Sequence, residues 1–255
     1  MEENIAPKNE NTTNILGNIE KTSIQSTTKN EATIVRENVE KEIVKGTLRM
    51  KLNKMRHLVI KQAIRPEYLD SLFPTILKYF DPQQVEYNGG IAKIKKWKIS
   101  CYLEVMEGGI PCTNPNTTLL KECQPLLDQC NDLFQSWYRQ QKNKDVDVKR
   151  IMTFITRYTP NPGEEALLKH VDGAGKVDGS VVVALPIDRW SGPEEENSFE
   201  GHGGGLTFWD GRGQQEIDYD TRSGDVAFID RAVWHQANPI TKGTRWALVI
   251  FYKVC

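Results

Sequence analysis

Two segments of the chain repeat apolar residues at the spacing of an α-helix. In "RPEYLDSLFPTILKYF" (65–80) they recur at i, i+3, i+4, i+7 and i+11 counted from Leu69, and Pro66 stands where helices commonly begin. The run "CQPLLDQCNDLFQSWYRQQ" (123–141) has the same periodicity. Each segment predicts an amphipathic helix packed on a sheet, and Pro74 is expected to kink the first one.

Strand patterns lie before, between and after these helices. "HLVIKQAI" (57–64) and "KIKKWKISCYLEV" (93–105) predict two strands, and after about residue 150 short apolar runs alternate with Gly, Pro and Asp. Many short strands with polar turns favour a sandwich or barrel over a parallel α/β sheet. We therefore predict a mainly β fold (α+β), a jelly roll with supporting N-terminal helices. The expected core strands are "IMTFITRYT", "LLKHVD", "SVVVALPI", "GGLTFWD", "EIDYD", "DVAFID" and "TRWALVIFYKV".

The chain divides into a polar tail and one folded domain. Residues 1–46 are rich in Asn, Glu, Thr and Lys, and the first aromatic residue of the protein is Tyr68. Such a segment buries too little apolar surface to offset its ordering entropy, so we predict a disordered tail with a short helix in "ATIVRENVEKEIVKG". Residues 47–255 form the domain, with a strand–helix support (47–149) and a β core (150–255).

Charge and cysteine content narrow the classes of partner. The 33 Lys and Arg balance 34 Asp and Glu, which favours neither a nucleic acid nor a membrane surface as partner. The start of the sequence lacks the basic and apolar regions of a signal peptide, and no run is long enough to span a bilayer. The five cysteines include no CxxC pair. We expect reduced thiols and an intracellular, cytoplasmic location.

The stretch "KHVDG" (169–173) is the strongest candidate for a metal site. On a strand, His170 and Asp172 would point to the same face, and His235 lies in another strand-like run. Two histidines and one carboxylate bind Fe(II) and leave coordination positions open, whereas structural zinc is closed by four protein ligands. His202, in a glycine-rich loop, is either a substrate contact, a rival ligand or a plain loop residue.

Arg245 lies ten residues after His235 within the apolar strand "TRWALVIFYKV". A cation in such a strand is costly to bury without a partner, and a guanidinium suits a bidentate carboxylate. We interpret Arg245 as the anchor for a small acidic ligand near the metal. The alternative is an edge-strand arginine that faces solvent.

These motifs resemble those of the Fe(II)/2-oxoglutarate-dependent dioxygenases, in particular the prolyl 4-hydroxylase-like branch. The similarity is carried by "ITRYTPNPGEEALLKHVDG", "GGGLTFWD" and "TRSGDVAFID". It implies a double-stranded β-helix in which His170, Asp172 and His235 bind Fe(II) as the catalytic centre. It further implies that Arg245 and Tyr158 hold the cosubstrate 2-oxoglutarate, that O2 is the oxidant, and that ascorbate is an optional cofactor.

The resemblance also implies a substrate class and shows departures from the family pattern. Peptidyl proline is the family's common substrate, and a free amino acid or another small molecule is the alternative within the enzyme class. The strand "VVVALPI" offers no hydroxyl after Ser180, so a second donor for the carboxylate is expected from Thr207 or Thr244. A second arginine typical of nucleic-acid demethylases is missing after Arg245, so no nucleic-acid substrate is expected.

Other classes of function stay open at this point. A β-barrel binding module without iron would keep the fold and lose the chemistry, and a zinc hydrolase would use the same ligands without 2-oxoglutarate. The loop 188–204 is either a lid over the substrate or an ordinary acidic surface loop. Trp190 and Trp209 would line a substrate groove or belong to the core.

Overall fold

The structure is a computed structural model of the 255-residue chain. The predicted disordered tail (1–46) with its short helix lies outside the described residues, as does the loop 188–204, interpreted as either a lid or a surface loop, with Trp190 and His202. The described residues are 56–83, 86–87, 90–91, 97–104, 114–142, 145–160, 169–186, 205–209, 216–240 and 243–255.

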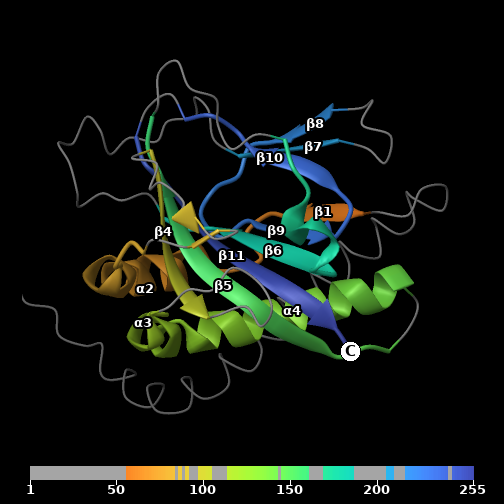
Figure 1. Ribbon diagram of the computed structural model, residues 1–255, viewed down its shortest axis with the longest axis horizontal. Coiled ribbons are helices and arrows are strands. Elements are labelled where there is room, and N and C mark those ends of the chain that lie inside the picture. The colour runs from red at the N-terminus through yellow and green to blue at the C-terminus, as the bar shows by residue number, and fades with distance from the viewer. Residues whose placement is uncertain are drawn as a thin grey trace, which may run out of the picture.

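Two antiparallel sheets face each other, and helices cover the outer face of the larger one (Figure 1). The six-stranded sheet has the order β1 (His57–Ile60), β9 (Val226–Asp230), β6 (Gly179–Ala184), β11 (Arg245–Val254), β5 (Val148–Tyr158) and β4 (Lys98–Glu104). The three-stranded sheet has the order β10 (Trp234–Ala237), β7 (Leu206–Trp209) and β8 (Glu216–Tyr219), and β2 (Glu86–Tyr87) pairs with β3 (Gly90–Ile91). This arrangement confirms the predicted jelly-roll fold.

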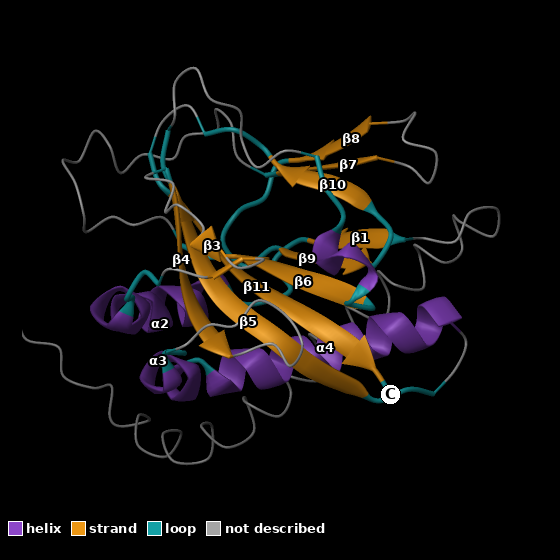
Figure 2. Cartoon of the chain, viewed as in Figure 1, coloured by secondary structure: helices purple, strands orange, loops and turns teal. Residues whose placement is uncertain are grey.

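The helices are α2 (Pro66–Tyr79), α3 (Thr117–Glu122) and α4 (Gln124–Lys142), with a 3-10 turn η1 (Asp172–Gly175). Both predicted helices are confirmed, and α2 continues through Pro74. The sequence analysis missed the short α3, which begins where the side chain of Asn116 accepts a 2.9 Å hydrogen bond from the amide of Leu119. Figure 2 shows that all three helices lie on the same side of the six-stranded sheet.

Strand β11 separates the two cores of the protein. Trp246, Leu248, Ile250 and Tyr252 pack with the helices, whereas Ala247 belongs to the cluster between the two sheets. Because successive side chains on a strand point to opposite faces, Arg245 shares the inner face with Ala247. The buried arginine of the predicted motif therefore points between the sheets, where a ligand can lie, and away from the helices.

The prediction of a strand over 167–172 is wrong for its described part. His170 forms only an isolated bridge with His235, and Asp172 opens the η1 turn. The predicted strand "DVAFID" is confirmed as β9, and a turn closed by a 3.0 Å hydrogen bond from the amide of Val233 to the carbonyl of Asp230 divides the strand-like run 228–240 into the end of β9 and the separate strand β10. His235 therefore lies in a strand of the smaller sheet.

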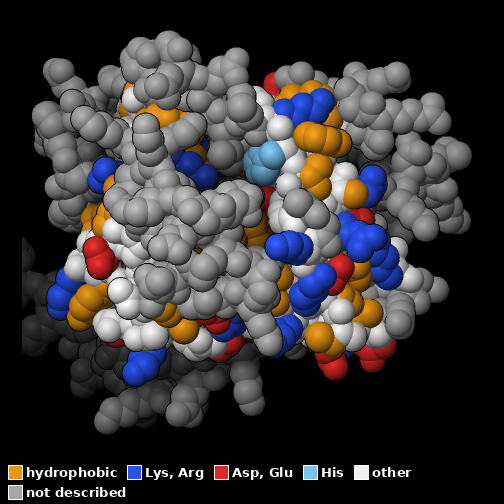
Figure 3. Space-filling model, in the orientation of Figure 1, with side chains coloured by type: hydrophobic (Ala, Val, Ile, Leu, Met, Phe, Trp, Pro, Cys, Tyr) orange, Lys and Arg blue, Asp and Glu red, His pale blue; other side chains and the backbone are white. Residues whose placement is uncertain are grey.

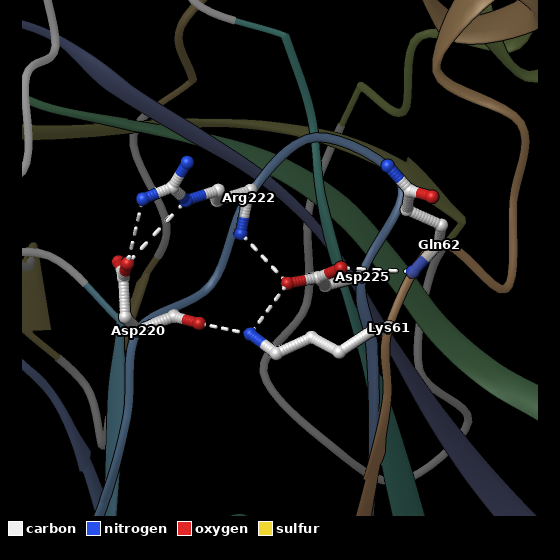
Figure 4. A network of polar contacts seen from close by, with 5 residues as sticks. All are labelled: Lys61, Gln62, Asp220, Arg222 and Asp225. Atoms are coloured by element: carbon white, nitrogen blue, oxygen red, sulfur yellow. Dashed lines mark hydrogen bonds and ion pairs between the residues drawn. The ribbon is translucent and has the colours of Figure 1, made fainter.

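A polar network fixes the turn that leads into β9 (Figure 4). The buried carboxylate of Asp225 accepts hydrogen bonds from the backbone amides of Gln62 (2.9 Å) and Arg222 (2.8 Å) and from the Lys61 ammonium (2.9 Å). Gly224 adopts φ +89°, and a Cβ there would lie 2.2 Å from the carbonyl oxygen of Ile64. The Gly-Asp pair thus ties the end of β1 to the start of β9, which fixes the strand before the His235 segment.

Among the described residues, no helix combines the length and the apolar character that crossing a bilayer requires.

Candidate metal centre and cosubstrate site

His170, Asp172 and His235 form a compact cluster of metal-ligating side chains. One donor atom from each residue lies within 4.8 Å of the others. The Asp172 carboxylate lies between the imidazoles, with Oδ1 3.5 Å from His170 Nε2 and Oδ2 3.5 Å from His235 Nε2. Ligand atoms about 2.1 Å from a metal and at right angles would be roughly 3 Å apart, so these donors need only small movements to share one ion.

The backbone brings the two histidines together although 64 residues separate them in the sequence. Their amides and carbonyls exchange two hydrogen bonds of 2.9 Å, and their rings lie 4.4 Å apart. The chain then turns sharply at Gly173, which adopts φ +58°, and a Cβ at this position would lie 2.7 Å from Cγ1 of Val177. This turn keeps the side chain of Asp172 beside both imidazole rings. The bridge and the turn therefore bring the three side chains together, which the sequence analysis expects of a strand.

A hydrogen bond to the backbone determines which ring nitrogen of His235 can bind a metal. Its Nδ1 lies 3.1 Å from the carbonyl oxygen of Val233, and because a carbonyl can only accept, this nitrogen carries the hydrogen. Burial lowers the pKa of His235, an effect that the charge of Asp172 partly opposes. The imidazole is therefore neutral near pH 7, with the Nε2 lone pair directed toward Asp172 and available to a metal.

Asp172 is held in its ionised form although it is buried. Burial alone would raise its pKa, but the hydrogen bond with His170, the nearby His235 and a hydrogen bond from the Ser180 hydroxyl together lower it. Ser180 lies on β6 of the larger sheet. A carboxylate ligand fixed by a neighbouring hydroxyl is a common supporting contact in metal sites.

Arg245 is a buried cation that has an unsatisfied hydrogen-bond donor. The residue is 7% exposed, and its Nη1 is buried without a hydrogen-bond partner among the described residues. Burial lowers the pKa of its guanidinium, and the opposing influence of Tyr158 is smaller. Tyr158 is the direct neighbour of Arg245 across β5 and β11, and its ring centroid lies 5.5 Å from the guanidinium carbon. The two residues predicted to hold 2-oxoglutarate therefore lie side by side.

A second cation, which the sequence analysis missed, lies on the other side of Tyr158. Lys98 on β4 is paired with Tyr158, and its ammonium lies 5.8 Å from the ring centroid. Cross-strand neighbours share a face, so Lys98, Tyr158 and Arg245 all occur on the inner face of the sheet. Only the pairing of β4 with β5 reveals this proximity, because 59 residues separate Lys98 from Tyr158.

The predicted threonine donors have other surroundings. The Thr207 hydroxyl contacts the side chains of Asp218 and Asn238, and Thr207 lies on the smaller sheet. Thr244 is half-buried and directly precedes Arg245. The structure therefore places Lys98, rather than Thr207, beside the Arg245–Tyr158 pair.

His57 is half-buried and lies outside this cluster. Its ring stacks on Phe208 at 4.3 Å, and burial, followed by the proximity of His235, lowers its pKa to about 4. It is therefore neutral and packs behind the metal ligands. Among the described residues, the cluster of His170, Asp172 and His235 is the one group of three or more potential ligands that could hold an ion.

The site fits Fe(II) and 2-oxoglutarate by two independent observations. Two imidazole donors and one carboxylate are a three-ligand set that leaves positions open for a chelating acid and O2. Among the described residues the buried Nη1 of Arg245 has no acceptor, and a carboxylate such as the distal one of 2-oxoglutarate would supply it. The larger sheet carries small side chains near Arg245, where Ala247 is directly opposite Ala184.

Comparison with known proteins agrees with this chemistry. The family model of the 2OG-Fe(II) oxygenase superfamily matches residues 153–253, which contain all three candidate ligands and Arg245. No curated protein sequence matches the chain.

Solved structures share the fold at low sequence identity. A Trichoplax adhaerens prolyl hydroxylase in complex with a hypoxia-inducible factor peptide fragment has a TM-score of 0.54 and 16% identity, covering 91% of this chain and 94% of that one. A Pseudomonas putida prolyl-4-hydroxylase has a TM-score of 0.53 and 13% identity, covering 78% and 92%. The epimerase SnoN in complex with Fe3+, α-ketoglutarate and nogalamycin RO has a TM-score of 0.51 and 12% identity, covering 85% and 84%.

The matched segment, the jelly-roll fold and the His-Asp-His cluster lead to one conclusion. Residues 153–253 match the family model of the 2OG-Fe(II) oxygenase superfamily, and the site within them is that of a dioxygenase that uses Fe(II), 2-oxoglutarate and O2.

Proposed function

We propose that this dioxygenase hydroxylates an aliphatic C–H bond of a prolyl residue in a peptide or protein. The observation that carries the reaction type is the three-ligand cluster on the inner face of a jelly roll, together with a buried, unpaired Arg245. The peptide substrate is supported by structural similarity to two prolyl hydroxylases, one of them solved with a peptide.

We assign the iron to His170, Asp172 and His235. When bound, Fe(II) with 2-oxoglutarate and O2 supplies an oxidative decarboxylation that yields succinate and CO2 and drives insertion of oxygen into a C–H bond. The protein's own contribution is to hold two imidazoles and one carboxylate at a fixed spacing. The hydrogen bonds from Ser180 and to the Val233 carbonyl keep the donor atoms oriented while other ligands exchange.

We assign the distal carboxylate of 2-oxoglutarate to Arg245, Tyr158 and Lys98. Arg245 offers a buried N–H that has no partner among the described residues, Tyr158 offers a hydroxyl, and Lys98 adds a second positive charge beside the same ring. Two cations beside the same tyrosine ring favour a dicarboxylic 2-oxo acid over pyruvate, which lacks the second carboxylate. Lys98 thereby takes the position of the second donor that the strand after Ser180 lacks.

The first experiment is an anaerobic titration with Fe(II) and then 2-oxoglutarate, followed by the visible charge-transfer band of a 2-oxo acid chelated to Fe(II). The band should form in the parent protein and disappear in His170→Ala. A folded, metal-loaded parent that forms no band would favour a zinc hydrolase or a binding module instead. Formation of succinate from 2-oxoglutarate on addition of proline-containing peptides then tests the substrate class.

A free amino acid is the second candidate substrate. Its support is the superfamily itself, in which SnoN was solved with a small molecule, nogalamycin RO. The two candidates separate in one assay. Free proline and an N-acetylated, C-amidated proline peptide are compared at equal concentration, and hydroxylation of the free amino acid alone would contradict the peptide proposal.

A further inference from the structure

An aromatic and basic patch lies beside the metal ligands on the outer face of the smaller sheet. It consists of Lys169, Trp209 and Trp234, which we call the Trp–Lys patch. Trp209 and Trp234 are directly opposed across β7 and β10. The Lys169 ammonium lies 4.3 Å from the Trp209 ring centroid and 5.9 Å from that of Trp234. Each end of the patch is therefore one residue from a candidate iron ligand, His170 or His235.

The patch is open to solvent. Trp234 is 46% exposed, more than any other large hydrophobic side chain among the described residues. Lys169 is also exposed. Figure 3 shows hydrophobic and basic side chains gathered over the β7–β10 region, next to a histidine that reaches the surface. An indole left half in water beside a reaction centre is a feature of binding surfaces, where Trp is among the side chains that contribute most.

The charge of the patch favours an acidic partner. No carboxylate within the described part of the chain forms an ion pair with Lys169, whose contacts are with the two indole rings. Cation–π contacts hold the ammonium in place without neutralising it, so it can still attract an anion. A cross-strand Trp pair alone would stabilise the sheet, but it would not need a free positive charge between the rings.

We propose that the Trp–Lys patch binds the peptide substrate on one side of its target residue, with an apolar ring on Trp234 and a carboxylate on Lys169. This inference rests on the proposed peptide substrate. It adds that the enzyme prefers peptides with an acidic residue near the target proline. The side chains of Lys169 and Trp234 lie roughly 10 Å from the metal position, given their adjacency to the ligands and the length of the side chains. An extended peptide covers that span in about three residues, so the acidic residue belongs about three positions from the target proline.

The test uses synthetic peptides of nine residues with one central proline, one phenylalanine next to the varied position, and otherwise Gly and Ala. Three series carry Asp, Asn or Lys three positions before or three positions after the proline. Binding of fluorescein-labelled peptides to the anaerobic Fe(II)/2-oxoglutarate protein is measured by anisotropy, and hydroxylation is measured by the mass increase of one oxygen. The binding readout does not depend on turnover.

We expect the parent to bind the Asp series about fivefold more tightly than the Asn series, and the Lys series most weakly. Lys169→Gln should remove the preference and Lys169→Glu should reverse it, with unchanged affinity for 2-oxoglutarate. Trp234→Ala should weaken all three series alike. The matched control is Lys78→Glu, because Lys78 also lies over an aromatic ring (4.9 Å from the Tyr79 centroid) but belongs to α2 on the far side of the larger sheet.

The possible results distinguish a failure of the Trp–Lys patch from a failure of the proposed peptide substrate. Peptides that are bound and hydroxylated without a charge preference, or with a preference that Lys169→Glu leaves intact, would overturn the role of the patch and leave the proposed function standing. If the charge-transfer band forms but no peptide of any series is bound or hydroxylated, the peptide substrate itself is refuted, and the patch proposal with it.

Discussion

Replacing Arg245 by methionine should make the protein more stable without ligand while weakening its affinity for 2-oxoglutarate. The guanidinium is buried, its Nη1 has no described hydrogen-bond partner, and burial lowers its pKa. In the absence of 2-oxoglutarate, Arg245 is therefore a partly unsatisfied buried charge. Methionine fills a similar volume with an unbranched apolar chain and removes both the charge and the unpaired donor.

The two effects have opposite signs and different sizes. An unsatisfied buried donor costs about 1–3 kcal/mol, so the ligand-free variant should gain about that much free energy of unfolding. For a domain of this size, this gain corresponds to a rise of roughly 2–10 °C in Tm. Removing one partner of a buried, charge-assisted contact costs about 3–4 kcal/mol, which weakens 2-oxoglutarate binding about 100- to 1000-fold.

Urea unfolding of the metal-free, ligand-free proteins measures the first effect, and titration of the charge-transfer band measures the second. The control is Arg222→Met, because the Arg222 side chain is 80% exposed and its contact within the described part of the chain is with Asp220, so both quantities should stay nearly constant. If Arg245→Met lost more than about 1 kcal/mol of stability without ligand, the guanidinium must already be well paired in the folded protein. Unchanged 2-oxoglutarate affinity would remove Arg245 from the cosubstrate site.

Three further outcomes follow from other contacts. Lys98→Gln should weaken 2-oxoglutarate binding about tenfold and leave metal affinity unchanged, because one of the two cations beside the distal carboxylate is lost. If titration of the charge-transfer band gave equal 2-oxoglutarate affinities for the parent and the variant, Lys98 would be excluded from the site. Ser180→Ala should lower metal affinity about 10- to 100-fold in a competition with a chelator, because Asp172 loses the hydroxyl that donates to it. An unchanged metal affinity would show that this hydrogen bond does not support the metal site. Burial raises the pKa of the Cys123 and Cys130 thiols to about 12 from 9.0, so stability is fully present below pH 9 and falls above it, as the unfolded thiols ionise first. Each thiol adds a slope of about 1.4 kcal/mol per pH unit, and C130A should show a shallower decline in urea unfolding between pH 9 and pH 11.

The elements that the sequence predicted best are those with a strong local pattern. The helical repeat of α2 and the alternating or fully apolar runs of β5, β6 and β11 each reflect a face that must be buried, and burial of that face is what the structure shows. The prediction that Arg245 marks a ligand also came from a local conflict, a cation within an apolar strand, and the structure retains that conflict as a buried unpaired donor.

The elements that sequence analysis missed depend on contacts between distant segments. A strand was predicted around His170 because HxD alternates like a strand, but the residue's only described ladder partner is His235, and the turn at Gly173 ends the extended conformation there. Lys98 was missed because its place beside Tyr158 is set by the register of β4 on β5, which no pattern within either strand encodes. Pairing register is decided by the whole sheet, so residues that meet across it have no signature in the sequence.

The way in which the site is divided between the two sheets explains why the fold and the chemistry depend on each other. Both imidazoles belong to the bridge at the edge of the smaller sheet, whereas the hydroxyl that holds Asp172 and the cations beside Tyr158 belong to the larger sheet. A metal bound by the three ligands, together with an acid that reaches Arg245, would connect the two sheets across their inner faces. Ligands that bind the folded state alone stabilise it. The jelly roll therefore need not satisfy Arg245 with a partner of its own, because the cosubstrate that the reaction requires can supply the missing carboxylate.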